Sequence, residues 1–221
     1  EVSGKNGMEH LLTVMPNIDV ALVGEPTGMH PAIAEKGLMV LDLTAHGKAG
    51  HAARNEGDNA IYHAMDDIAW FRNYQFPKQS ELLGPVKMSV TIVNAGTQHN
   101  VVPAECTFTV DVRSNECYSN EELLELIRQH VDCDVQPRST HLNSSYISSD
   151  HPAVKRLLDM GCKAFGSPTM SNQAVMPFTT LKLGPGDSAR SHTADEYILL
   201  SEIAEAVEIY VALLDKLKIE N

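Results

Sequence analysis

Apolar and polar residues alternate through the middle of the chain in a way that predicts an α+β unit. Three runs carry an apolar residue at every second position and indicate strands, at residues 39–45, 86–92 and 106–112. Two other stretches have helical spacing, one capped by Asp58 and one in which Ser119 and Glu122 fit a capping box. With an extended segment at 134–147, the order is β-α-β-β-α-β, which is typical of ferredoxin-like domains.

The segments on either side of this unit have a different pattern and predict a second α/β unit. Its expected elements are helices at residues 7–15, 152–165 and 198–217 and strands at residues 19–23 and 177–184. We therefore expect residues 37–147 to be a domain inserted into a unit formed by residues 1–36 and 148–221.

Two turns of the outer unit carry side chains that could support chemistry. Glu25 follows the strand at 19–23, and Pro26 keeps it out of helical conformation. His192 lies in a turn that begins with Gly-Pro-Gly after the strand at 177–184. Open α/β sheets bind ligands beyond the carboxyl ends of their strands, and an imidazole beside a carboxylate is a common metal-binding pair.

A structural interpretation of both turns stays open at this point. Ser191 or Thr193 could cap the following helix, with Asp195 and Glu196 favoured by its positive end. Glu25 could equally be a solvated glutamate in a turn.

Composition narrows the class of protein without naming a substrate. The formal net charge of −12 and the pI of about 5.2 argue against nucleic acid and anionic membranes as partners. No apolar run is long enough to span a membrane, and no signal-peptide pattern opens the chain. The four scattered cysteines are typical of reduced thiols, so we expect a cytoplasmic protein.

Six short motifs occur in a fixed order along the chain. They are Glu1 with Gly7, Gly24-Glu25-Pro26-Thr27, Gly47-Lys48-Ala49-Gly50-His51-Ala52, Asn100-Val101-Val102-Pro103, Asp111-Val112-Arg113, and Gly184-Pro185-Gly186 with His192-Thr193-Ala194-Asp195-Glu196. Together they resemble the two-metal amidohydrolases that include acetylornithine deacetylase, succinyl-diaminopimelate desuccinylase, aminoacylase and glutamate-releasing carboxypeptidases. The last motif looks most similar to the acetylornithine deacetylase branch, including relatives that act on succinylornithine.

This resemblance implies a fold and an activity. The fold is an α/β catalytic sheet domain of the zinc-exopeptidase type, here incomplete, with an inserted ferredoxin-like dimerisation or lid domain. The implied reaction is hydrolysis of the amide of N-acetyl- or N-succinyl-L-ornithine, in arginine biosynthesis. Succinyl-diaminopimelate, small peptides and other acylated amino acids are the alternative substrates. A non-catalytic dimerisation or binding scaffold is the alternative from a different class.

The resemblance also implies roles for individual residues. Two zinc ions, replaceable by cobalt or manganese, would be held in part by Glu25 on one ion and by Glu1 and His192 on the other. His51 would hydrogen-bond the oxyanion in the active site of a partner subunit, within a homodimer formed through residues 37–147. The implied substrate-binding residues are Asn100, Arg113, Gly184, Gly186 and Ser188. From the residues alone, His51 could be a loop histidine without a role and Arg113 a strand-end arginine facing water.

Two features depart from the pattern of the family. The general base, a histidine-x-aspartate motif and the bridging aspartate are expected before Glu1, so we expect these 221 residues alone to be inactive. Asn172 also stands where many relatives have an aspartate; an amide keeps the acceptor but loses the charge.

Overall fold

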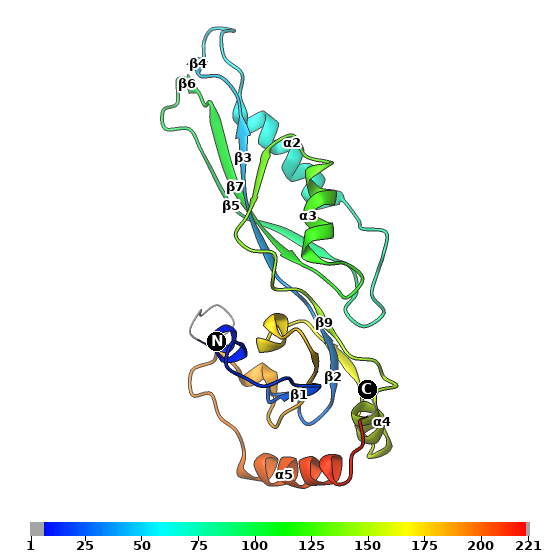
Figure 1. The fold of residues 1–221 in the computed structure, drawn as a ribbon. Helices are drawn as coiled ribbons and strands as arrows, with labels where there is room; N and C mark the ends of the chain where they lie inside the picture. Colours follow the sequence, from blue (N-terminus) through cyan, green and yellow to red (C-terminus); the bar gives the residue numbers. More distant parts are fainter. Residues whose placement is uncertain (1–6, 220–221) are drawn as a thin grey trace. The chain divides into compact units, whose positions relative to one another are not determined.

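The structure is a computed structural model that describes residues 7–219. The chain forms two compact units, Glu1–Lys36 with Ser144–Asn221 and Gly37–Asn143 (Figure 1). We refer to them as the outer unit and the inserted unit. Within the described part of the chain, no helix has both the length and the apolar character needed to cross a membrane.

The inserted unit contains a four-stranded antiparallel sheet in the order β5-β7-β3-β8. Its elements are β3 (Met39–His46), α2 (Ala60–Asn73), β5 (Lys87–Ala95), β7 (Glu105–Arg113), α3 (Asn120–Arg128) and β8 (Asp134–Pro137). A second sheet pairs β4 (Gly50–His51) with β6 (Val101–Val102). This strand order confirms the predicted ferredoxin-like arrangement.

The apolar core of the inserted unit lies on one face of its sheet. Along β3, residues alternate between buried and partly buried, and Met39, Leu41 and Leu43 are almost completely buried. Leu123 and Ile127 of α3 belong to the same core cluster, together with residues of α2. Because both helices contribute to one cluster with alternate strand residues, they cover the same face of the sheet.

The opposite face of this sheet is polar. The Asp42 carboxylate receives two hydrogen bonds from the Arg138 guanidinium, at 2.8 and 2.9 Å, and one from Thr109 Oγ1 at 3.0 Å. These bonds favour the charged form and hold the pKa of Asp42 below its ordinary value.

The two predicted helix starts in this unit fared differently. The Ser119–Glu122 capping box is present in full. The prediction that Asp58 caps α2 is wrong, because the side chain of Asn59 accepts the hydrogen bond from Ile61 N. Asp58 pairs through its backbone with Lys48 in both directions, which keeps it extended, and its carboxylate binds His63 Nε2 at 2.7 Å.

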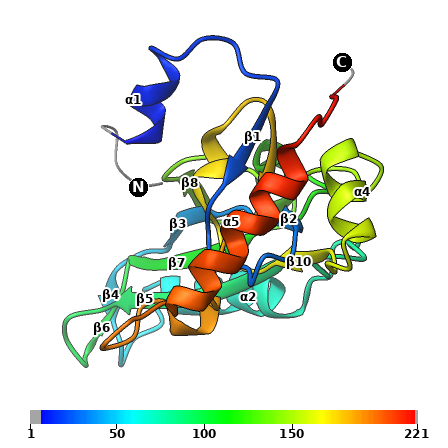
Figure 2. The ribbon, with the colours of Figure 1, turned by 90° about the horizontal axis from the view of Figure 1, so that it is seen from below.

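The outer unit contains a five-stranded mixed sheet with the path β1-β11-β2-β10, and β9 pairs with β2. Its strands are β1 (Val20–Val23), β2 (Ala32–Glu35), β9 (Ser145–Tyr146), β10 (Phe165–Ser167) and β11 (Thr179–Lys182). Its helices are α1 (Met8–Leu12), α4 (Pro152–Asp159), α5 (Leu200–Leu214) and the short 3-10 turns η1 (Asn172–Val175) and η2 (Ser188–Arg190). Figure 2 shows α5 lying across this sheet.

Several elements of the outer unit differ from the sequence prediction. Helix α4 ends at Asp159 instead of 165, because Gly161 takes a positive φ of 89° and β10 begins soon afterwards. Strands β2 and β10 were not predicted, and β9 lies in the predicted extended segment 134–147 but belongs to the outer sheet. The second crossing between the units lies at 143/144 and not at 147/148, since Ser145 and Tyr146 pair with β2.

Candidate functional site

Two turns interlock beyond the carboxyl ends of β1 and β11. These strands are parallel neighbours with Val23 opposite Lys182, so the chain leaves both of them at the same edge of the sheet. The Gly184 carbonyl accepts hydrogen bonds from Thr27 N at 3.0 Å and from Met29 N at 3.1 Å. The Gly186 carbonyl accepts another from Gly28 N at 2.8 Å. Backbone groups therefore join the turn that carries Glu25 to the Gly-Pro-Gly turn.

Both glycines of the Gly-Pro-Gly turn are required by geometry. A Cβ atom on Gly184 would lie 2.5 Å from the carbonyl oxygen of Glu25, closer than real Cβ contacts. Gly186 has a φ of 88°, in the left-handed region that side chains disfavour. These positions bring the backbone of the turn directly against the backbone of Glu25.

His192 lies further along the same segment, in a strained conformation. It is exposed, and its φ of 61° is positive, as is the φ of 60° at Asp195. The Glu196 carboxylate accepts a hydrogen bond from His192 N at 3.3 Å. Positive φ at residues other than glycine costs of order 1 kcal/mol each and clusters at functional sites.

The alternative in which this turn is simply a helix start is wrong. Helix α5 begins only at Leu200, and Leu199 is its N-cap residue. Thr193 Oγ1 donates to the carbonyl of Arg190 at 2.6 Å and does not cap a helix. The turn is therefore an independent structure between η2 and α5.

A cavity of about 300 Å³ opens beside these turns. Its lining residues are Pro26, Pro185, Gly186, Asp187, Arg190, Ser191, Glu196, Tyr197 and Ile198. Arg190 Nη1 binds both carboxylate oxygens of Glu202, at 3.0 and 2.8 Å, and its guanidinium lies 4.6 Å from the centre of the Tyr197 ring. The hydrogen bond from Arg190 lowers the pKa of Glu202, and Glu202 raises the pKa of Arg190. This ion pair fixes one wall of the cavity.

The predicted metal ligands are only partly represented in the described chain. Glu25 and His192 both belong to the outer unit, and a carboxylate with an imidazole suits zinc. Glu1 lies outside the described residues. Within residues 7–219, no group of three or more His, Cys, Asp or Glu side chains is arranged to hold a metal ion. A two-metal centre therefore needs donors in addition to Glu25 and His192.

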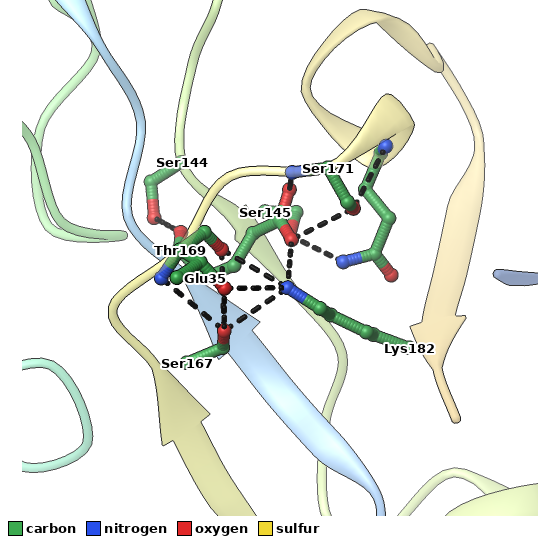
Figure 3. A network of polar contacts seen from close by, with 8 residues as sticks. Glu35, Ser144, Ser145, Ser167, Thr169, Ser171 and Lys182 are labelled. Carbon is green, nitrogen blue, oxygen red and sulfur yellow. Dashed lines mark hydrogen bonds and ion pairs between the residues drawn. The ribbon is translucent and has the colours of Figure 1, made fainter. Parts of the chain in front are cut away.

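A buried ion pair that was not predicted joins β2 to the end of β11, two residues before the Gly-Pro-Gly turn (Figure 3). Glu35 of β2 is fully buried, and its Oε2 atom lies 3.2 Å from the ammonium of Lys182, the last residue of β11. Lys182 also donates to Ser167 Oγ at 3.0 Å and to the Thr169 carbonyl at 3.0 Å. A charged residue at the end of an apolar run, such as Glu35 after residues 32–34, is the sequence signal that could have revealed the pair.

The same carboxylate fixes the segment that precedes β11. Glu35 accepts hydrogen bonds from Ser171 N at 3.1 Å and from Ser171 Oγ at 2.8 Å. Ser171 in turn caps η1, which begins with Asn172. The side-chain oxygen of Asn172 is buried and has no hydrogen-bond partner among the described residues. The pair Glu35–Lys182 thus orders both the η1 segment and the end of β11.

In the inserted unit, the structure brings His51 and Asn100 together. The β4–β6 pairing places His51 opposite Val101, and Ala52 N donates to the Asn100 carbonyl at 3.0 Å. His51 is exposed, and its Nδ1 atom accepts a hydrogen bond from Ala53 N at 3.1 Å. Because a backbone N–H can only donate, the neutral ring carries its proton on Nε2, which leaves that nitrogen as a donor.

Arg113 lies at the other end of the sheet. It pairs with Lys87 at the far end of β7, whereas Asn100 precedes the start of that strand. Nine residues of extended chain span about 26 Å. Arg113 is half-buried, and its guanidinium makes two hydrogen bonds to Asp111, at 2.7 and 3.0 Å. The inserted unit therefore separates Arg113 from His51 and Asn100.

Comparisons with known proteins place this fold. Residues 33–136 match the peptidase dimerisation domain family. The chain is 25% identical over 228 residues to the acetylornithine deacetylase of Photorhabdus laumondii subsp. laumondii, covering 95% of this chain and 59% of that protein. Other curated relatives of similar identity are named putative succinyl-diaminopimelate desuccinylase and [LysW]-lysine/[LysW]-ornithine hydrolase.

Solved structures show the same fold. The aminopeptidase PepT of Bacillus cereus matches with a TM-score of 0.75 at 18% identity, over 97% of this chain and 61% of that one. A Bacillus subtilis protein described as a dinuclear metal binding peptidase from the M20 family matches with a TM-score of 0.65 at 14% identity, over 93% of this chain and 60% of that one.

The inserted unit thus matches a peptidase dimerisation domain over most of its length, and the predicted resemblance to two-metal amidohydrolases and peptidases is confirmed. The chain spans about half to two thirds of the length of the curated relatives it matches, for example 47% of one and 64% of another.

Proposed function

We propose that the protein is a metal-dependent amidohydrolase that releases ornithine from N-acetyl- or N-succinyl-L-ornithine, a reaction of arginine biosynthesis in the cytoplasm. One observation carries the proposal. The turns after β1 and β11 are joined by backbone hydrogen bonds at one edge of the sheet, and their segments carry Glu25 and His192. The names of the curated relatives support amide hydrolysis as the class of reaction.

Each residue has a proposed task. Glu25 and His192, with Glu1, would hold two zinc ions, for which cobalt or manganese could substitute. When bound, such ions polarise an amide carbonyl and provide a nucleophile at neutral pH. Backbone groups from Gly184 to Gly186, with Ser188, would orient the substrate. A carboxylate group on the substrate could bind the guanidinium of Arg113, in competition with Asp111.

We further propose a homodimer formed through the inserted unit. Strand β5 is an edge strand, and its residues Ile92 and Val93 are exposed, as are Tyr62 and Met65 of α2. An open edge with apolar side chains is suited to pairing with a second copy. In that dimer, the Nε2–H group of His51 would serve the oxyanion of the partner's site, together with Asn100.

Substrate assays on the full-length protein test the proposed reaction. We expect the highest kcat/KM for an acylated ornithine, compared among N-acetyl-L-ornithine, N-succinyl-L-ornithine and N-succinyl-diaminopimelate. N-succinyl-diaminopimelate is included because a relative of 26% identity is named a putative succinyl-diaminopimelate desuccinylase. A preference for N-succinyl-diaminopimelate would change the proposed substrate but leave amide hydrolysis as the class of reaction. Absence of metal-dependent hydrolysis of all three, and of small peptides, would contradict the proposal.

Mixing two inactive variants tests the sharing of His51. One variant is His51→Ala, and the other is His192→Asn, which is disabled at the metal site. If His51 acts in the partner's site, the mixed dimer has one site with both residues intact and regains activity. Proven mixed dimers without recovery would contradict the shared site. His63→Asn is the matched control, because this exposed histidine binds only Asp58. We also expect the 221-residue chain alone to be inactive.

A further inference from the structure

A groove in the inserted unit lies apart from every residue of the proposed active site. Its volume is about 610 Å³, and its lining residues are Tyr74, Pro77, Lys78, Tyr118, Glu121, Glu122, Glu125, Leu126 and Gln129. They come from the end of α2, the segment that follows it, and α3, which run beside one another in Figure 1. Small-molecule sites have volumes of roughly 300–1,000 Å³, so the groove has the size of a ligand pocket.

The sequence explains why the segment after α2 stands away from α3. Tyr74 ends the helix in an extended conformation, with ψ of 134°. The segment is then fixed from its other side, since Lys78 N donates to the hydroxyl of Tyr118 at 2.8 Å and Ser80 Oγ donates to a Glu116 carboxylate oxygen at 2.5 Å. These bonds hold the segment in place without closing it onto the helix.

Aromatic side chains with fixed positions form the apolar part of the groove. Tyr74 stacks on Trp70, with ring centres 4.6 Å apart and an angle of 27° between the planes. The rings of Tyr74 and Phe76 meet edge to face, with centres 5.0 Å apart. The Tyr118 ring also packs edge to face against Phe76, with centres 5.6 Å apart. Because their neighbours hold them, both tyrosines present apolar surface without first having to be ordered by a ligand.

The charged residues of the groove are mostly acidic. Three glutamates of α3 line it against a single lysine. Of these, the Glu125 carboxylate is paired with Arg128 Nη1 at 3.0 Å, and the Glu122 carboxylate accepts a hydrogen bond from Ser119 N. The ammonium of Lys78 already contacts the Cys117 carbonyl at 3.3 Å and lies 4.8 Å from the centre of the Tyr118 ring. The exposed Glu121 carboxylate makes no hydrogen bond or ion pair with any residue that the structure describes. The groove therefore offers a carboxylate beside aromatic faces.

We propose that this groove binds a small organic cation, namely a protonated amine on an aromatic or aliphatic body. The amine would meet the Glu121 carboxylate and, in competition with Arg128, that of Glu125, and the body would lie against Tyr74 and Leu126. An anionic ligand of the same shape would meet two like charges. The groove has room for one small molecule. A protein partner is a less suitable occupant, because a stable protein interface buries about 800 Å² on each partner, over a broader surface than this groove. This site is independent of the proposed hydrolysis.

The test compares three probes of similar shape on the full-length protein: 2-phenylethylammonium, 2-phenylethanol and 3-phenylpropionate. We expect the amine to bind most tightly and the carboxylate most weakly. Amide signals in NMR spectra should shift at residues 74–78 and along α3. Fluorescence of Trp70, the one tryptophan of the sequence, should change as well, because it stacks on Tyr74.

Charge-neutralising variants decide whether the glutamates are responsible. The double variant Glu121→Gln/Glu125→Gln should weaken binding of the amine about fivefold and leave binding of 2-phenylethanol unchanged. Glu105→Gln, an exposed residue at the start of β7, removes one charge away from the groove and should change neither. Equal binding of all three probes, shifts located elsewhere, or an unaltered affinity in the double variant would overturn the proposal.

Discussion

The interiors of the two units differ in the interactions that stabilise them. In the inserted unit, alternate strand residues and two helix faces form one apolar cluster. In the outer unit, the fully buried Glu35 and the almost buried Lys182 form an ion pair between the ends of β2 and β11. The outer unit also exposes apolar side chains along α5, where Leu200, Val207 and Val211 are each more than half exposed. Such a face is typical of a helix that packs against another element.

This difference between the two interiors affects how strongly a mutation inside each unit should disturb the site that the unit carries. The core cluster of the inserted unit includes Tyr118 and Leu124, with Leu126 packed against it, so it supports the groove beside α3. The outer unit also buries apolar residues such as Leu157 and Leu181, but it adds the buried Glu35–Lys182 pair, and Lys182 precedes Gly184 by two residues. Changes in its polar interior should therefore reach the candidate site, whereas changes in the apolar core of the inserted unit should stay local.

The largest effect should come from breaking the buried ion pair. Lys182→Met leaves the Glu35 carboxylate buried without its cation, which should lower the free energy of unfolding by about 3–5 kcal/mol. Hydrogen exchange should lose protection in β2, β11 and η1 but not in β3 or β7. The double variant Glu35→Gln/Lys182→Met should be less damaged. Lys155→Met, whose exposed ammonium lies 3.0 Å from Asp150, should cost less than about 1 kcal/mol. Equal costs for the two lysines would contradict the contrast between the units.

A smaller and strictly local effect is expected from the capping box of α3. Ser119→Ala removes the acceptor for Glu122 N and should cost about 1 kcal/mol, confined to the inserted unit. Ser119→Asp is the matched control, since an aspartate can accept the same hydrogen bond and should retain most of the stability. Loss of exchange protection in β11 of the outer unit would show that the units are coupled more strongly than we propose.

The smallest effect concerns pH and the polar face of the inserted sheet. Hydrogen bonds from Arg138 lower the pKa of Asp42 in the folded chain. The ion pair therefore contributes stability above the pKa of an unfolded aspartate, and this contribution is lost as pH falls through the lower pKa of the folded state. Carboxyl NMR signals should place the Asp42 pKa below that of exposed aspartates, and Arg138→Met should raise it. A titration unchanged by that substitution would contradict the assignment.

The sequence predicted most of the inserted unit because local rules decide its elements. Alternation identified β3 and β7, and Ser119 with Glu122 identified the start of α3. The prediction that Asp58 caps α2 failed, because the backbone pairing of Asp58 with Lys48 is a tertiary contact that sequence spacing does not reveal. Strands β2 and β10 were missed for a similar reason, since each is short and is stabilised by its neighbours in the sheet.

The candidate site was predictable only where its residues follow strand ends. Glu25 and Gly184 lie at neighbouring strand ends, as their motifs suggested. The alternative in which Ser191 or Thr193 caps the following helix is wrong, because α5 begins only at Leu200. Neither Glu35 nor Lys182 was identified, because pairing charges from separate strands requires the sheet order to be known. The separation of Arg113 from His51 likewise depends on the register of β7.

Metal analysis of the full-length protein tests the central claim most directly. We propose zinc at the site that includes Glu25 and His192, so the purified protein should contain about two zinc ions per chain. The double variant Glu25→Gln/His192→Asn should contain less than about one, with its fold intact by circular dichroism, while His63→Asn should match the unmodified protein. A double variant that retains about two zinc ions, or an unmodified protein that binds none, would contradict the account.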